Sequence, residues 1–237
     1  MLFRQLFDTR SSTYTYLLAD GQTGRAALID PVLEQTDLYL QLLTELDLTL
    51  HYAIDTHIHA DHVTALGRLR HETACQTVQD SHSSAQGLCL QPANGDVLTL
   101  GNLRLTWLHT PGHTRESACL YWPAGNSVFT GDALLIRGTG RTDFQQGCAR
   151  QAWRSLRDQL LSLPDETLVY PGHDYRGLCC STIGEERRFN PRLQVADEDQ
   201  YAALMAGIAL PRPKAMDIAL PQNMHLGWPT AAQGLPA

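Results

Sequence analysis

The sequence has 237 residues, a formal charge of −7 at neutral pH, and hydrophobic and charged fractions of 43% and 18%. This composition is typical of a globular enzyme, and the negative charge argues against general nucleic-acid binding, which requires a basic surface. No apolar run approaches the length of a membrane-spanning helix. Because the first eight residues lack the apolar stretch of a secretory signal and the six cysteines have no C-x-x-C spacing, we expect a cytoplasmic protein with reduced cysteines and no membrane partner.

The first half of the chain alternates predicted strands and helices. The strands are β-branched, aromatic or apolar runs, and the first helix has a stripe of leucines along one face. In chain order we expect strands at 2–8, 13–20 and 26–32, a helix at 35–46, a strand at 50–54, a helix from His62 to about residue 73, a strand at 74–79, and a hairpin at 96–108. The hairpin turns at Gly101-Asn102.

The second half continues the alternation. In chain order we expect strands at 117–122 and 127–130, a helix at 149–162, a strand at 167–170, and helices at 181–189 and 197–207. The tail from Leu210 is rich in proline, and we expect it to lie over the surface as extended chain. Since no repeat, linker or low-complexity segment interrupts the pattern, the sequence predicts one domain over residues 1–237 with a short C-terminal extension from about residue 208 to 237.

Candidate metal ligands gather where predicted strands end. His57-Ile58-His59-Ala60-Asp61-His62 places three imidazoles and one carboxylate within six residues. Its two-residue spacing does not fit a helical motif, so we expect a loop that aims several side chains at one point. Three further strand ends carry the same donor types, namely His113 after Pro111-Gly112, Asp132 after Gly131, and His173 after Pro171-Gly172. Two packed sheets with helices outside both would bring these strand ends to one edge.

The four segments, in this order, resemble the metallo-β-lactamase superfamily over residues 10–190. The resemblance implies an α/β (α+β) fold, an αββα four-layer sandwich of two mixed β-sheets flanked by helices. It also implies positions for two metals. His57, His59 and His113 would hold one, Asp61, His62 and His173 would hold the other, and Asp132 would bridge them.

Five segments, one of which contains His173, carry a closer resemblance: residues 134–149, 170–175, 185–192, 211–214 and 219–224. They are similar to the glutathione persulfide dioxygenase family, also called sulfur dioxygenases. The resemblance implies an enzyme that oxidises glutathione persulfide with O₂ and water to sulfite and glutathione, in the catabolism of hydrogen sulfide and persulfides. It also implies one Fe(II) per chain, and a homodimer is common among proteins that look like this one.

Position by position, the family resemblance makes His57, His113 and Asp132 the catalytic metal ligands. Two imidazoles and one carboxylate form a facial triad, which leaves coordination positions open for O₂ and for the persulfide sulfur. The other members of the set, His59, Asp61, His62 and His173, would then orient the ligands through hydrogen bonds.

Cations and one tyrosine are the candidates for binding the glutathione part, which carries two carboxylates. They are Arg137, Arg141, Tyr175, Arg176, Arg212 and Lys214. For Arg176 and Arg212, a solvated surface charge is an equally good interpretation, and Asp143 offers Arg141 a structural partner.

Two other functions fit parts of the pattern. A glyoxalase II-type hydroxyacylglutathione hydrolase would share the fold and the metal motif but would use two metals to activate water against a thioester. The short chain after His173 counts against it, because such hydrolases usually carry a longer helical C-terminal domain. A non-catalytic sulfur-binding module is the alternative from another class.

Overall fold

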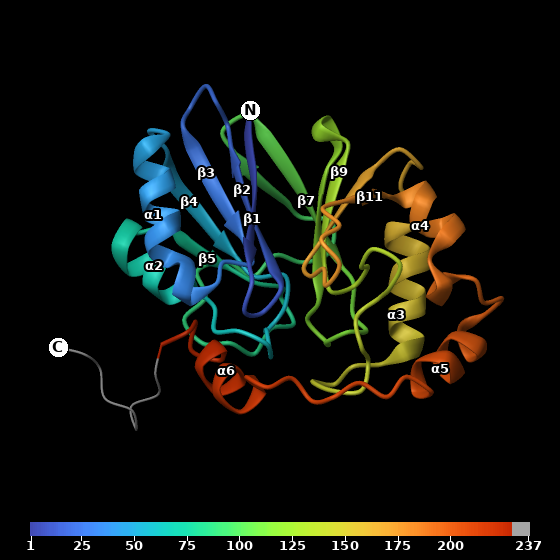
Figure 1. The fold of residues 1–237 in the computed structure, drawn as a ribbon. Helices are drawn as coiled ribbons and strands as arrows, with labels where there is room; N and C mark the ends of the chain where they lie inside the picture. The colour runs from blue at the N-terminus through green and yellow to red at the C-terminus, as the bar shows by residue number, and fades with distance from the viewer. Residues whose placement is uncertain (229–237) are drawn as a thin grey trace.

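Two β-sheets packed face to face form the centre of the computed structural model, which describes residues 1–228 (Figure 1). The first sheet has the order β1-β2-β3-β4-β5 and the second the order β11-β10-β9-β8-β7-β6. Both sheets are mixed: β3, β4 and β5 run parallel in the first, β9 and β10 run parallel in the second, and the remaining neighbours are antiparallel. Helices cover the two outer faces, so the predicted four-layer metallo-β-lactamase sandwich is confirmed.

The elements have the following bounds. The strands are β1 (Leu2–Asp8), β2 (Thr13–Ala19), β3 (Arg25–Ile29), β4 (Thr49–Ile54), β5 (Gln76–Val78), β6 (Val97–Leu100), β7 (Leu103–His109), β8 (Ala118–Trp122), β9 (Ser127–Gly131), β10 (Leu168–Pro171) and β11 (Ser181–Thr182). The helices are α1 (Thr36–Glu45), α2 (Leu66–Thr73), α3 (Ala149–Ser155), α4 (Ile183–Phe189), α5 (Glu198–Ala206) and α6 (Met216–Asn223). None of these helices combines the length and the hydrophobicity needed to cross a lipid bilayer, within the part of the chain that the structure describes.

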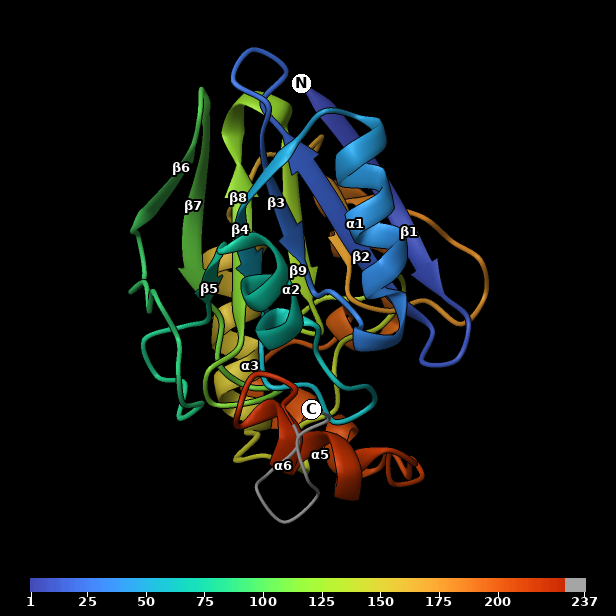
Figure 2. The same cartoon turned by 90° about the vertical axis from the view of Figure 1, so that its left-hand side faces the viewer.

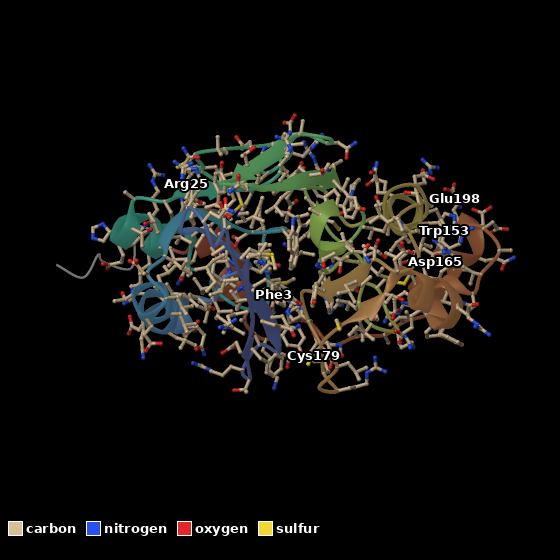
Figure 3. All side chains as sticks on the ribbon, turned by 90° about the horizontal axis from the view of Figure 1, so that it is seen from above. Phe3, Arg25, Trp153, Asp165, Cys179 and Glu198 are labelled. Atoms are coloured by element: carbon tan, nitrogen blue, oxygen red, sulfur yellow. The ribbon has the colours of Figure 1, made fainter. Side chains whose placement is uncertain are left out.

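Three apolar clusters hold the layers together, and Figure 3 shows the layers from above. Between the sheets, aromatic side chains such as Tyr16, Trp107 and Phe129 alternate with leucines. Leucines and Tyr39 join α1 and α2 to the first sheet, and a third cluster around Leu156 and Tyr201 joins α3 and α5 to the second. Every residue of β2 and β9 is buried, because both faces of these strands are covered.

Several helices begin or end at other residues than the sequence predicts, because tertiary contacts determine the local conformation there. The helix expected from His62 starts at Leu66, because Thr64 forms a bridge to Val32 and keeps the preceding residues in a loop. The helix expected at 149–162 is α-helical only to Ser155 and continues as a π turn over Leu156–Leu160. Ser181 and Thr182 pair with β10, so the helix expected at 181–189 begins at Ile183.

The prediction of an extended tail is wrong, because the chain folds into α6 after residue 215. In Figure 1 this helix lies beneath the lower edge of the two sheets, where the β3 and β4 strands end. Pro221 sits inside the helix, but Met216, Ala219 and Asn223 are buried against the domain. Packing of one face therefore outweighs the missing amide of proline. Residues 229–237 of the predicted extension lie outside the described residues.

Asn223 joins α6 to the histidine-rich loop. Its side chain is fully buried, and its Oδ1 accepts a hydrogen bond of 2.9 Å from the amide of Thr64. Its Nδ2 donates to the carbonyl oxygens of His59 and His62, at 2.8 and 2.9 Å. One amide group thus satisfies three buried backbone groups of the loop, which no secondary-structure ladder reaches.

The substitution Asn223→Asp keeps the acceptor but replaces both donors with a carboxylate oxygen facing two carbonyls. We expect it to lower the free energy of unfolding by at least about 2 kcal/mol, since it leaves buried acceptors unpaired beside a charge. Urea denaturation measures the change. Ile218→Ala, at an exposed position of the same helix, is the matched control and should change stability by less than about 0.5 kcal/mol. Equal stability of the two variants would mean that α6 does not restrain the loop.

Candidate metal centre

A buried carboxylate at the end of β3 anchors the loop that follows β4. Asp30 is 1% exposed and has a positive φ of 51°, which turns its side chain toward the neighbouring strand end. Its Oδ1 accepts from the amide of Thr56 at 2.7 Å, and its Oδ2 accepts from the Thr56 hydroxyl at 2.9 Å. Oδ1 also lies 3.2 Å from Nε2 of His59. Burial alone would lower the pKa of His59, but the charge and hydrogen bond of Asp30 raise that pKa to about 9.

Three of the predicted ligands converge from separate strand ends. One potential ligand atom each of His57, His113 and Asp132 lies within 4.8 Å of the others. The His57 and His113 rings are nearly perpendicular, with centroids 4.8 Å apart, and Nε2 of His113 lies 3.6 Å from Oδ2 of Asp132. Such a group of two imidazoles and one carboxylate can hold a divalent metal.

Backbone groups and glycines fix this arrangement. Nδ1 of His113 donates to the carbonyl of Arg141 at 2.7 Å, which directs Nε2 toward Asp132. A Cβ on Gly140 would lie 2.8 Å from the His113 ring, and a Cβ on Gly172 would lie 2.8 Å from Oδ1 of Asp132. These two positions therefore require glycine if the imidazole and the carboxylate are to keep their places.

The protonation states suit metal binding. Burial, followed by the proximity of His59 and His113, lowers the pKa of His57 well below its usual value, so the imidazole is neutral. Burial opposes ionisation of Asp132, but the positive charge of His173 outweighs it and lowers the Asp132 pKa. A neutral imidazole and an ionised carboxylate are the forms that bind a metal.

The remaining residues of the motif form an ion-pair network around His173. Nδ1 of His173 lies 2.6 Å from Oδ1 of Asp132, and its Nε2 lies 2.9 Å from Oδ2 of Asp61. Burial disfavours a charged imidazole, but the two carboxylates raise the pKa of His173 well above its usual range. Protonated His173 thus donates to both carboxylates, and Nδ1 of His62 lies 2.9 Å from the same Asp61 oxygen.

Two buried nitrogens of these residues remain without a hydrogen-bond partner among residues 1–228, namely Nδ1 of His59 and Nε2 of His62. A buried polar atom without a partner is uncommon in native proteins and marks a place where a ligand or water belongs. The donor set of His57, His113 and Asp132 fits a metal ion, and all seven predicted members of the set lie in or beside this centre.

Two residues of the centre escaped the sequence analysis as functional groups. Thr13, at the start of β2, is fully buried, and its hydroxyl lies 3.1 Å from Oδ2 of Asp61 and 3.2 Å from Nε2 of His173. No sequence signal marks it, because only strand pairing across the molecule brings it there. Asp30 had a signal, since an aspartate at the end of an apolar strand is a candidate for the carboxyl edge of a sheet.

A cavity of about 940 Å³ opens beside the centre. It is lined by His57, Asp61, His62, His113, Asp132 and His173, and by all six predicted substrate contacts, Arg137, Arg141, Tyr175, Arg176, Arg212 and Lys214. Arg10 also lines it and was missed by the sequence analysis. The volume lies within the range typical of small-molecule sites.

Most of these cations already have partners within the protein. Arg137 pairs with Glu185 and Glu186, and Arg212 pairs with Asp217. Arg141 binds Asp143 through two hydrogen bonds of 2.6 and 2.8 Å and also reaches the carbonyl of Pro211. Arg176 donates to the carbonyl of Ile136 at 2.6 Å.

Two of the predicted contacts, Lys214 and Tyr175, are open to a ligand. Lys214 is exposed, and its side chain has no hydrogen bond or ion pair within the described chain. The Tyr175 ring is 75% exposed and lies nearly parallel to the His173 ring, with centroids 6.1 Å apart. Lys214 is therefore the predicted contact whose charge is least neutralised.

Comparison with known proteins agrees with this geometry. The family model described as the metallo-beta-lactamase superfamily matches residues 8–82 and 91–173. The mitochondrial persulfide dioxygenase ETHE1 of Mus musculus is 46% identical over 231 residues, which cover 97% of this chain and 90% of that protein. The crystal structure of ETHE1 from Myxococcus xanthus superposes with a TM-score of 0.93 at 51% identity, covering 96% of this chain and all of that one.

A protein named as a probable hydroxyacylglutathione hydrolase, from Schizosaccharomyces pombe, is more distant. It is 33% identical over 220 residues, which cover 78% of this chain and 84% of that protein. The hydrolase alternative is therefore not favoured, and neither is a non-catalytic sulfur-binding module. The chain belongs to the persulfide dioxygenase family of the metallo-β-lactamase superfamily.

Proposed function

We propose that this protein is a mononuclear iron(II) persulfide dioxygenase acting on glutathione persulfide. The reaction takes one persulfide, one O₂ and one water and yields glutathione and sulfite. Its oxygen atoms balance, because two come from O₂ and the third from water. A cytoplasmic location and a homodimer stay predictions of the sequence.

The position of His173 is the observation that favours one metal ion over two. Its imidazolium donates to Asp132 at 2.6 Å and to Asp61 at 2.9 Å. A second divalent ion would need these same carboxylates and a neutral imidazole. Asp61 and His173 are thus hydrogen-bonded to each other, and we propose the group of His57, His113 and Asp132 as the metal site.

The donor set of that group favours iron. Two imidazoles and one carboxylate with open positions are typical of non-haem iron(II) oxygenases. Iron(II) bound there would activate O₂ and offer an open position for the terminal persulfide sulfur, which itself would supply the four electrons that reduce O₂.

The protein's own residues orient the reactants. The Arg141 carbonyl holds His113 in one tautomer, and His173 fixes Asp132 through the oxygen that does not face His113. Lys214 and Arg10 line the cavity as exposed cations, which suits the two carboxylates of glutathione. Arg137, Arg141, Arg176 and Arg212 have the partners described above, so we propose that they shape the cavity wall and contact glutathione with their remaining N–H groups.

Asp132→Ala should abolish binding of iron(II), because it removes the only carboxylate of the proposed ligand group. Asp61→Ala should retain most of it, with affinity lower by about 10- to 100-fold, since Asp61 acts through His173 and His62. Iron content after anaerobic loading and desalting measures both variants. Equal loss of iron in the two variants would mean that the iron ligands are wrongly assigned.

Protein loaded anaerobically with iron(II) should hold about one iron per chain and consume O₂ when glutathione persulfide is added. An oxygen electrode follows the uptake, and sulfite formation is measured in the same samples. Two zinc ions per chain together with thioester hydrolysis would instead support the glyoxalase II-type alternative. Absence of O₂ uptake with iron(II) retained would contradict the dioxygenase proposal.

Lys214→Ala should raise the KM for glutathione persulfide by about tenfold with kcat little changed, since a carboxylate contact remote from the sulfur stabilises ground and transition states equally. Arg212→Ala is the matched control, because Arg212 is paired with Asp217 and should have a smaller effect. Steady-state O₂ uptake at varied persulfide concentration gives both constants. A larger KM effect for Arg212→Ala than for Lys214→Ala would reverse the assignment.

A further inference from the structure

A second group of metal-binding side chains lies outside the proposed iron site, between β5 and β7. Asp80 and His82 belong to the loop after β5, and His109 is the last residue of β7. In Figure 2 the end of β5 lies close to the carboxyl end of β7. One potential ligand atom of each residue lies within 4.8 Å of the others. The three residues therefore repeat, in a different place, the donor set of two imidazoles and one carboxylate.

The two imidazoles converge on one carboxylate oxygen. Nδ1 of His82 lies 2.8 Å from Oδ1 of Asp80, and Nδ1 of His109 lies 3.2 Å from the same atom. The two rings are stacked with centroids 4.2 Å apart and planes 20° apart. Both Nδ1 atoms thus lie close to the same carboxylate oxygen.

The carboxylate is built into the core. Asp80 is 1% exposed, and its other oxygen, Oδ2, accepts a hydrogen bond of 2.7 Å from Nε1 of the fully buried Trp107. Burial disfavours the charge of Asp80, but the nearby His109 ring and hydrogen bonds from the His82 amide and Trp107 lower its pKa below the usual value. A ligand carboxylate oriented by a hydrogen bond to its second oxygen is a common feature of metal sites.

Hydrogen bonding alone leaves one atom of the group unsatisfied. Oδ1 of Asp80 already accepts from the backbone amide of His82 at 2.9 Å and lies within hydrogen-bonding distance of the His82 ring. Nδ1 of His109 is buried and makes no hydrogen bond within residues 1–228. The backbone of His109 is held by the side chain of Asn94, whose Oδ1 accepts from the His109 amide at 2.9 Å. The ring nitrogen therefore faces the carboxylate without a partner, where an ion would satisfy it.

We propose that Asp80, His82 and His109 bind one divalent transition-metal ion, separate from the proposed iron site. Imidazole and carboxylate donors suit zinc, nickel and copper, and such sites hold zinc more tightly than iron(II). The His82 side chain is 48% exposed, so the ion has access from solvent and water can complete its coordination. The ion would tie the loop after β5 to the end of β7, four residues before His113.

Zinc binding to the iron-loaded enzyme tests the proposal. The protein is first loaded anaerobically with one iron(II), and zinc is then titrated in the presence of a chromophoric chelator. The wild type should take up one zinc per chain while its iron is retained. His82→Ala should weaken this uptake by about 100-fold or more, because it removes a ligand without disturbing the buried Asp80. His71→Ala, which removes another exposed histidine, should bind zinc as the wild type does.

A second measurement identifies the ligands directly. Cobalt(II) added to the iron-loaded protein should shift or broaden the ring resonances of His82 and His109, and not those of His71. Binding of no zinc beyond the amount that replaces released iron, or unchanged binding in His82→Ala, would each overturn the proposal. O₂ uptake with glutathione persulfide should be unchanged in His82→Ala, so failure of the dioxygenase proposal and failure of this one are distinguishable.

Discussion

The loop that carries His57, His59, Asp61 and His62 depends on a buried carboxylate on the neighbouring strand. Asp30 binds the amide and hydroxyl of Thr56 and faces Nε2 of His59, so the ends of the parallel strands β3 and β4 are joined through one side chain. A charge buried to this degree is costly unless each oxygen is hydrogen-bonded. Asp30 meets this condition only when the loop takes the observed path, and this makes the loop conformation specific.

The same balance of burial and pairing explains the two halves of the centre. Asp132 is held in its charged form by His173, and Asp61 is held in its charged form by His62 and His173. One half thereby presents a neutral His57 and an ionised Asp132, as a metal requires, and the other half is closed by an internal cation. In the centre that we propose to be mononuclear, some donors of a two-metal superfamily motif therefore bind each other instead of a second metal.

The cations that line the cavity fall into two groups, those paired with carboxylates of the chain and those left open to a ligand. The arginines predicted to bind substrate lie on its wall, but Arg137, Arg141 and Arg212 are paired with carboxylates of the chain. Pairing holds their guanidinium groups in place and reduces the net positive charge presented to a ligand. Lys214 keeps its charge open to the cavity, which is the reason to assign it a carboxylate of the substrate.

The sequence by itself determined most strands and helices along the chain and the candidate set of seven histidines and aspartates, and its resemblance to a known superfamily implied the αββα class. The order of the strands within each sheet was decided by the tertiary structure. Strand and turn preferences are local, and the spacing of His57, His59, Asp61 and His62 is unusual enough to stand out from composition. Proline content misled the prediction for the tail, because the burial of Met216, Ala219 and Asn223 that stabilises α6 comes from contacts with distant parts of the chain. Only the tertiary structure decided that Asn223 holds the loop, that Thr13 joins the centre, and that Asp80, His82 and His109 meet. Each of these depends on residues from separate elements approaching within hydrogen-bonding distance, which no local pattern in a single sequence encodes.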